Sequence, residues 1–164
     1  MNPKRPERKF KILFLCNGNS ARSIMAEFFL KRLDPNRFEV FSAGAHPKGR
    51  VNPDVLDLLR DGYHIDAREA RSKSWEEFRD VKFDFVITVC DKARESCPIW
   101  PGQPIVAHWG SLDPDDVQGE EERRKAVKDV GVEIYRRLGL FTALPMESLD
   151  RLRLQEMTKA IGKK

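Results

Sequence analysis

An apolar run that ends in a cysteine, followed by a loop of small residues, constrains this chain more than any other stretch. Residues 10–15 are almost continuously apolar, Cys16 follows them directly, and a helical pattern opens at Arg22. Short apolar runs of this kind are typical of central parallel strands that are covered on both faces. The five small or polar residues between Cys16 and Arg22 allow the backbone to curl until its N–H groups point inward. The sequence therefore predicts a strand, an anion-binding loop and a helix in direct succession.

Each part of this loop suits a tetrahedral oxyanion. A helix that begins at Arg22 offers its unpaired N–H groups and the positive end of its dipole to an anion. The planar guanidinium of Arg22 can contact two ligand oxygens at once. The same positive field favours the thiolate form of Cys16 and would make it a nucleophile. The alternative interpretation is a buried cysteine at a strand end followed by an ordinary turn and helix, and Cys16 and Arg22 taken alone are compatible with both.

Strands and helices alternate along the rest of the chain. Residues 38–42, 83–89 and 104–108 have strand character, and the second of these segments is rich in β-branched and aromatic residues. Such an alternation predicts an α/β fold with an open parallel sheet and helices on both faces. Ligands of these sheets bind beyond the carboxyl ends of the strands, where Cys16 is expected. Helical patterns are predicted over residues 22–33, 52–62, 74–78, 117–138 and 146–161.

Length and composition indicate one globular domain. With 164 residues, 40% of them hydrophobic and 34% charged, the chain can bury a substantial core. Residues 1–9 are predicted to be a flexible tail and residues 10–164 a single catalytic domain. The net charge of +4 is mixed in sign and does not indicate a nucleic-acid partner, and no apolar run approaches the roughly 20 residues of a membrane span. Because no export signal is evident, we expect a cytoplasmic protein. We also expect it to be a monomer.

The three cysteines fit neither a disulfide-rich secreted domain nor a structural metal site, so we expect neither a metal nor an organic cofactor. Cys90 follows the strand predicted over residues 83–89, and Cys97 lies seven positions further on. If residues 91–96 are helical, the two cysteines face the same side with Cα atoms about 10 Å apart. A disulfide needs Cα atoms within about 7 Å, so a bond between them would require this helix to unwind. The alternative is a pair of buried cysteines in a core helix.

An acidic residue before a proline follows the last predicted strand. On such a loop Asp113, stiffened by Pro114, can hang over the anion loop. There it would act as a general acid that protonates a leaving oxygen. Asp115 and Asp116 lie close enough in the sequence to compete for this role.

The string from Cys16 to Ser23 resembles the phosphate loop of low-molecular-weight protein tyrosine phosphatases and of the arsenate reductases that share their fold. Within this superfamily, a second set of residues resembles the thioredoxin-coupled arsenate reductases: Cys90, Cys97-Pro98, His108-Trp109-Gly110 and Asp113-Pro114. The resemblance runs from about residue 11 to residue 114 and more loosely through the helix that follows. It implies a three-layer architecture, an open four-stranded parallel sheet with helices on both faces.

The resemblance also implies a mechanism. Cys16 attacks arsenate, and Asp113 protonates the departing hydroxide. Cys90 then attacks Cys16 and releases arsenite, and Cys97 moves the disulfide onto Cys90, where thioredoxin reduces it. Phosphate and sulfate should compete with arsenate. The implied catalytic residues are Cys16, Arg22, Cys90, Cys97 and Asp113, and the implied oxyanion ligands are Asn17, Gly18, Asn19, Ser20, Ala21, Arg22 and Ser23.

Two positions depart from the family pattern. Ala21 stands where members often carry a second loop cysteine, which lies outside the three-thiol relay. Members with a potassium ion beside the loop hold it with Asn, Glu, Ser and a downstream Asp, and this chain has Lys73 at the Asp position. We hypothesise that the Lys73 ammonium replaces the cation and braces Asn19 and Glu27. The helix predicted over residues 146–161 extends past the usual length and has no assigned role.

Two other functions compete with arsenate reduction. A phosphatase acting on phosphotyrosine or small phosphoesters needs Cys16, Arg22 and Asp113 but has no use for Cys90 and Cys97. A tyrosine-rich substrate wall is not evident either, because the chain has only two tyrosines. A non-catalytic anion-binding or redox-sensing module would have no need of Asp113. The sequence also leaves the electron donor open between thioredoxin, a glutaredoxin and a low-molecular-weight thiol.

Overall fold

The computed structural model of the protein describes residues 9–95 and 97–164. Its centre is a four-stranded sheet with the order β2-β1-β3-β4, in which all neighbouring strands are parallel. The predicted fold class is therefore confirmed. The tail predicted over residues 1–9 lies outside the described residues except for Lys9. The strands are β1 (Phe10–Cys16), β2 (Phe38–Gly44), β3 (Phe85–Thr88) and β4 (Ile105–His108).

The helices lie close to the predicted segments, with corrections at their ends. The segment predicted as one helix over residues 146–161 is divided, because the Asp150 side chain accepts a hydrogen bond from the Arg153 amide and caps a new helix there. The segment predicted from residue 117 becomes helical only at Glu120, after Gly119 has taken a positive φ of 93°. The α-helices are α1 (Arg22–Leu33), α2 (Pro53–Asp57), α3 (Asp91–Glu95), α4 (Glu120–Thr142) and α5 (Arg151–Ile161).

Short helical turns complete the chain. The Asn52 side chain caps α2 by accepting a hydrogen bond from the Asp54 amide, and the helix predicted over residues 52–62 continues beyond Asp57 as a π turn. Within the described residues, no helix is both long and apolar enough to cross a membrane. The turns are η1 (Leu58–Gly62), η2 (Trp75–Phe78), η3 (Pro114–Asp116) and η4 (Met146–Ser148).

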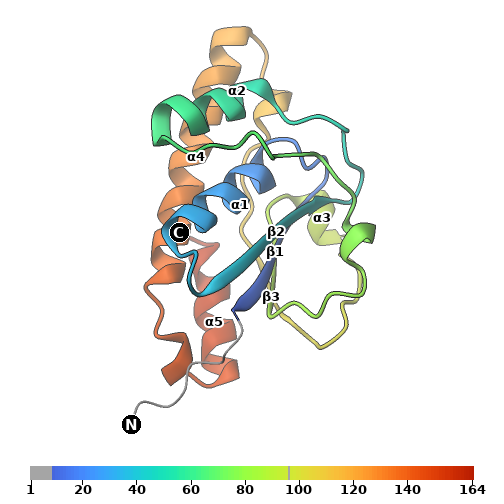
Figure 1. Cartoon of the computed structure of the whole chain (residues 1–164), viewed down its shortest axis with the longest axis vertical. Helices are drawn as coiled ribbons and strands as arrows, with labels where there is room; N and C mark the ends of the chain where they lie inside the picture. The colour runs from blue at the N-terminus through green and yellow to red at the C-terminus, as the bar shows by residue number, and fades with distance from the viewer. Residues whose placement is uncertain (1–8, 96) are drawn as a thin grey trace.

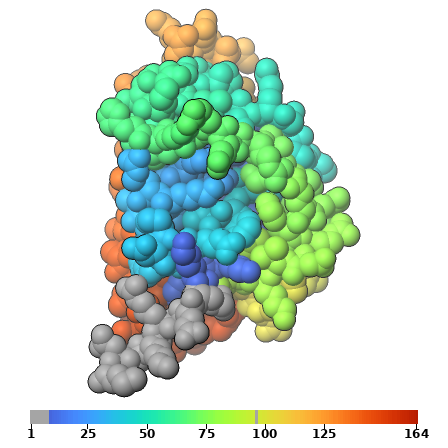
Figure 2. Space-filling model, in the orientation of Figure 1, coloured from blue at the N-terminus to red at the C-terminus, as the bar shows by residue number. Residues whose placement is uncertain are grey.

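Aromatic contacts show that both faces of the sheet are covered. Phe38 of β2 packs against Phe141 of α4 with ring centroids 5.4 Å apart. Phe41 of the same strand points to the opposite face and packs against Phe78 of η2 at 5.2 Å. Figure 1 shows α4 running along the long axis of the molecule beside α1, with α5 near its lower end. Figure 2 shows the segment around α2 in green above α1 and β2 in blue and cyan.

The sheet topology gathers the predicted chemistry at one edge. β1 ends at Cys16, Cys90 follows β3 after one intervening residue, and β4 ends at His108. Because these three strands are adjacent and parallel, their carboxyl ends meet at the same edge of the sheet. The fold therefore places Cys16, Cys90 and the loop after β4 side by side.

Shortening a side chain in the central strand should destabilise the whole domain. Ile12 of β1 is fully buried between β2 and β3. Replacing Ile12 by Ala should lower the free energy of unfolding by about 2–5 kcal/mol, measured by urea denaturation, because a cavity replaces the lost contacts. Val132→Ala on the exposed face of α4 is the matched control and should change it by less than about 0.5 kcal/mol. Equal losses in the two variants would contradict the assignment of Ile12 to the core.

Candidate active site

The loop after β1 is held by hydrogen bonds that turn its carbonyl groups outward. The two polar groups of a trans peptide unit point in opposite directions, so the amide that follows each carbonyl points into the loop. The Asn19 amide shows this orientation, because it donates to the Cys16 sulfur at 3.0 Å. The predicted anion nest therefore has the backbone geometry it requires. The carbonyls of Cys16, Asn17, Gly18 and Ser20 accept bonds of 2.8–3.0 Å from the amides of Ala45, His46, Lys48 and Asn52.

Two residues permit this tight curl. Asn19 has a positive φ of 46°, a region that asparagine enters more readily than most residues. Gly44, at the end of β2, passes so close that a Cβ atom there would lie 2.7 Å from the Asn17 carbonyl oxygen. Only glycine allows β2 to approach the loop in this way.

Cys16 is buried at the base of the loop among the predicted donors. Its sulfur lies 2.9 Å from the Ser23 hydroxyl, and burial raises the pKa of its thiol above the ordinary value. The Ser23 hydroxyl, the Arg22 charge and the Asn19 amide each lower this pKa, as expected. These donors favour the thiolate, as the sequence predicted for the loop. Burial has the larger effect, however, so the net pKa of Cys16 is raised. The donors are in place, but desolvation outweighs them.

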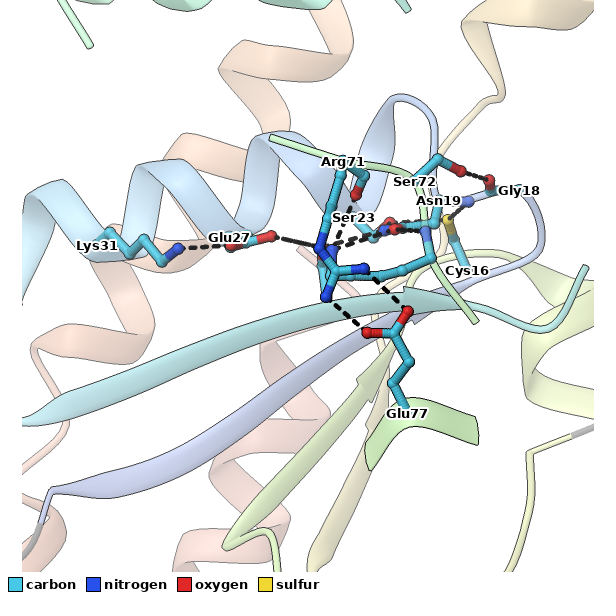
Figure 3. Close-up of polar contacts among 11 residues, drawn as sticks. Cys16, Gly18, Asn19, Ser23, Glu27, Lys31, Arg71, Ser72 and Glu77 are labelled. Carbon is cyan, nitrogen blue, oxygen red and sulfur yellow. Dashed lines mark hydrogen bonds and ion pairs between the residues drawn. The ribbon is translucent and has the colours of Figure 1, made fainter. Parts of the chain in front are cut away.

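Lys73 braces the loop from below, as hypothesised. Its ammonium donates to the Asn19 side-chain oxygen at 3.3 Å and to the Ser42 hydroxyl at 3.1 Å, and it lies 3.7 Å from the Glu27 carboxylate. Figure 3 shows Glu27 between Lys31 and Asn19, and Lys31 donates to one of the Glu27 carboxylate oxygens. Burial lowers the pKa of Lys73, while the Glu27 carboxylate opposes the shift. The ammonium therefore lies among the side-chain oxygens that the sequence assigned to a cation.

Asp113 lies against Arg22. Its carboxylate is 3.1 Å from one terminal nitrogen of Arg22, and the other terminal nitrogen donates to the Ser111 carbonyl at 3.0 Å. The rival acid Asp115 is paired with Lys48 at 2.5 Å. Burial raises the pKa of Asp115, but this pairing and further contacts outweigh burial and lower it. Asp113 lines the cleft beside the loop, whereas Asp115 is not among the described lining residues, so Asp113 is the better placed of the two.

A cleft of about 860 Å³ opens beside the loop, and both Arg22 and Cys90 line it. Its walls also include Asp113 and Lys48. Cys16 ends β1 and Cys90 follows its parallel neighbour β3, so both cysteines lie at the same edge of the sheet. Cys90 therefore lines the cleft together with Arg22, while Cys16 lies buried at the base of the loop and is not among the described lining residues.

Cys97 lies outside this cleft and outside a helix. α3 ends at Glu95, Ser96 is outside the described residues, and Cys97 is partly buried in irregular backbone. The helix considered over residues 91–96 is present over residues 91–95, and Cys97 itself lies in irregular backbone beyond it. Burial raises the pKa of the Cys97 thiol, and the Trp100 indole opposes this shift. All three cysteines are free thiols.

Several residues of the cleft were not among the site residues predicted from the sequence. Lys48, Ser111 and Glu133 line it, although only Ser111 lies near a motif, two positions before Asp113. Lys48 and Glu133 belong to segments whose local pattern carries no signal of function. Among the described residues, no group of three or more histidines, cysteines and acidic residues is arranged to hold a metal.

Similarity to known proteins assigns the chain to a family. The model of the low molecular weight phosphotyrosine protein phosphatases matches residues 11–115. The chain belongs to the low molecular weight phosphotyrosine protein phosphatase family. It is 37% identical over 118 residues to an arsenate reductase of Oceanobacillus iheyensis, and this aligned region covers 71% of this chain and 82% of that protein. The family predicted from the loop is thereby confirmed.

Solved structures of this family share the fold. One is an arsenate reductase in the phosphate binding state, with a TM-score of 0.64 and 30% identity over 79% of this chain and 97% of that chain. Another is a low molecular weight protein tyrosine phosphatase from T. tengcongensis, with a TM-score of 0.62 and 20% identity over 86% of this chain and all of that one. The second likeness concerns the fold alone.

Replacing Ser23 by Ala should move the alkylation of Cys16 to higher pH. The Ser23 hydroxyl lowers the pKa of Cys16, so its removal leaves the effect of burial less opposed. Because the thiolate is the reactive form, the rate of iodoacetamide modification in Ser23→Ala should rise at a higher pH than in the natural protein. Mass spectrometry of the Cys16 peptide measures this rate. Ser20→Ala is the matched control, since among the described residues the Ser20 hydroxyl makes no hydrogen bond to Cys16. An unchanged profile for Ser23→Ala would contradict the role of this hydroxyl.

Replacing Lys73 by Met should destabilise the domain, because the buried Glu27 carboxylate loses a partner. We expect a loss of about 3 kcal/mol in the free energy of unfolding. Lys31→Met removes the outer partner of the same carboxylate and should cost less than about 1 kcal/mol.

Exchanging NaCl for KCl at equal ionic strength should leave the melting temperature of the natural protein unchanged. A higher melting temperature in KCl would show that the Lys73 ammonium does not replace a potassium ion.

Proposed function

We propose that this protein is an enzyme that reduces arsenate to arsenite through a relay of three thiols. The observation that carries the proposal is the position of Cys90, which lines the same cleft as Arg22 and follows β3, the strand next to the one that ends at Cys16. A phosphatase needs one thiol, an arginine and an acid, whereas electron transfer to arsenic needs a second thiol within reach of the first. The arsenate reductases among its relatives support the same assignment.

Arsenate would bind in the loop formed by residues 17–23. The inward-pointing amides and the start of α1 would donate to its oxygens, and the Arg22 guanidinium would hold two of them. Phosphate and sulfate share the tetrahedral shape and should compete for the loop. The similar arsenate reductase in the phosphate binding state supports this expectation.

In the first step, the Cys16 sulfur forms a bond to arsenic and one arsenic–oxygen bond breaks. Asp113 donates a proton to the departing hydroxide, which leaves as water, and the proton released from Cys16 restores Asp113. Arsenic remains As(V) in this adduct. Arg22 neutralises charge on the remaining oxygens.

In the second step, Cys90 attacks the Cys16 sulfur. A Cys16–Cys90 disulfide forms, and the electron pair of the sulfur–arsenic bond stays on arsenic, which is reduced to As(III). Arsenite leaves with the proton of Cys90. Cys97 then attacks Cys90, so that a Cys90–Cys97 disulfide forms and Cys16 leaves as a thiol with the proton of Cys97. The short helix α3, which lies between Cys90 and Cys97, would rearrange to permit this exchange.

An external dithiol protein closes the cycle, and we propose thioredoxin. Its two thiols would reduce the Cys90–Cys97 disulfide by exchange and become a disulfide themselves. The scheme uses no metal and no organic cofactor. We further propose that the protein acts as a monomer in the cytoplasm, where thioredoxin keeps thiols reduced.

The walls of the cleft favour an inorganic oxyanion over an aromatic phosphoester. Besides the anion loop, they carry mainly charged side chains, including Lys48, Lys92, Asp116 and Glu133, and none of the described lining residues is aromatic. A phosphotyrosine ring would need an apolar or aromatic surface on which to pack. Leu112 is the one large aliphatic side chain among the lining residues.

The decisive assay couples arsenate reduction to NADPH oxidation through thioredoxin and thioredoxin reductase. The natural protein should turn over with arsenate, whereas Cys90→Ser and Cys97→Ser should each lose at least about 10²-fold in turnover. Asp113→Asn should slow turnover by about 10²-fold, because the general acid is lost.

Hydrolysis of p-nitrophenyl phosphate provides the control within the same proteins. Any such activity needs only Cys16, Arg22 and Asp113, so it should be equal in the natural protein, Cys90→Ser and Cys97→Ser. Phosphatase activity without arsenate reduction in the natural protein would overturn the proposal in favour of a phosphatase. Full arsenate turnover in Cys97→Ser would contradict the role assigned to the third thiol.

A further inference from the structure

Helix α5 has no part in the scheme above, yet it contacts the loop that carries Asp113. We call residues 109–113 the acid loop. The Trp109 indole nitrogen donates to the Thr158 carbonyl of α5 at 3.0 Å. At the end of the same helix, Gly162 passes so close to β4 that a Cβ atom there would lie 2.1 Å from the His108 carbonyl oxygen. α5 is therefore pressed against the base of the acid loop.

Arg137 of α4 connects this helix to the acid loop. One terminal nitrogen of its guanidinium donates to the Gly162 carbonyl at 3.3 Å, and the other donates to the Gly110 carbonyl at 3.0 Å. The second nitrogen also lies 3.4 Å from the Ser111 hydroxyl. The side chain is buried, and among the described residues its Nε atom has no hydrogen-bond partner. A buried guanidinium is costly unless it is well partnered. Its partners are two backbone carbonyls, the Ser111 hydroxyl and the Glu133 carboxylate at 3.6 Å.

The acid loop transmits this contact to the anion site. The Ser111 carbonyl accepts a hydrogen bond from Arg22 at 3.0 Å, so Arg22 and Arg137 contact the same residue of the acid loop. We propose that Arg137, seated against Gly162 of α5, is a positioning residue that sets the orientation of the Arg22 guanidinium through Ser111. This inference rests on the proposed role of Arg22 as an oxyanion ligand. It gives α5 a function in shaping the anion site.

The geometry also indicates that loss of Arg137 would disturb orientation more than folding. Ser111 keeps two other anchors, because its amide donates to the Val89 carbonyl at 3.2 Å and its hydroxyl donates to Glu133 at 2.6 Å. The acid loop would stay on the sheet while Gly110 and the Ser111 carbonyl lose their fixed position. An arginine fork contacts two oxygens only when it is aligned with them, so a small displacement weakens anion binding.

Protection of Cys16 by inorganic phosphate measures this effect in the full-length protein. Iodoacetamide modification of the Cys16 peptide is followed by mass spectrometry at increasing phosphate concentrations. Arg137→Lys keeps the charge but cannot bridge the two carbonyls, and it should weaken the apparent phosphate affinity by about tenfold. The pH profile of the modification should also move upward, because the Arg22 charge lowers the pKa of Cys16. Arg136→Lys is the matched control, since its neighbouring guanidinium reaches the Lys164 carbonyl instead, and it should change neither quantity.

A double-mutant cycle separates positioning from general destabilisation. If Arg137 acts through Arg22, then Arg137→Lys should change phosphate affinity by less than about twofold when Arg22 is already Lys. An equal tenfold loss in both backgrounds, or no loss in the first, would overturn the proposal. Failure to reduce arsenate would overturn the proposed function but leave this test intact, because phosphate protection requires no turnover.

Gly162→Ala tests the part assigned to α5 without touching either arginine. The backbone of Gly162 is ordinary right-handed helix, so alanine adds only the collision with the His108 carbonyl. The displaced Gly162 carbonyl should weaken phosphate protection severalfold, in the same direction as Arg137→Lys. Unchanged phosphate affinity in a folded Gly162→Ala protein would overturn the role of α5. This variant also carries the test if Arg137→Lys does not fold.

Discussion

The outward orientation of the loop carbonyls is the constraint on which the rest of the active site depends. The segment after β2 supplies the four amides that hold these carbonyls, so the inward face of the loop is left with N–H groups. Only a parallel neighbour that ends in glycine can come this close, and Gly44 provides that approach. The sheet and the anion site are therefore consequences of one arrangement, in which β2 both completes the fold beside β1 and sets the polarity of the loop.

Beneath the loop, the opposite charges of Lys73 and Glu27 are paired within a buried polar cluster. Lys73, Ser42 and Glu27 join the side chain of Asn19 to the body of α1, and these side chains are almost fully buried. The same exclusion of water acts on Cys16, whose pKa is raised by burial more than its donors lower it. Rigid support and a desolvated nucleophile thus have a common origin, and the charge of Arg22 beside the sulfur is correspondingly important.

Local patterns were enough to predict β1, the loop and the start of α1, because the apolar run, the small residues and Arg22 are contiguous. The resemblance added Lys73 and Asp113, and the structure places both against their expected partners. The net pKa of Cys16 could not be read in this way, since burial depends on packing from the whole domain. Arg137 and Gly162 were also beyond reach, because Arg137 contacts Gly162 and Gly110 across 25 and 27 positions of the chain. Cys97 shows a third limit, since helical spacing alone does not reveal that its backbone is irregular.

The ion pair between Arg22 and Asp113 has a consequence for selectivity. With the guanidinium already facing a carboxylate at 3.1 Å, any ion that enters must replace an interaction of comparable strength. Chloride or bicarbonate carries a single charge and gains little from such an exchange. A doubly charged tetrahedral ion gains more, and its protonatable oxygen offers the displaced carboxylate a new hydrogen bond. The resting site therefore contains its own competitor, which would keep the abundant monovalent anions of a cell from occupying the loop.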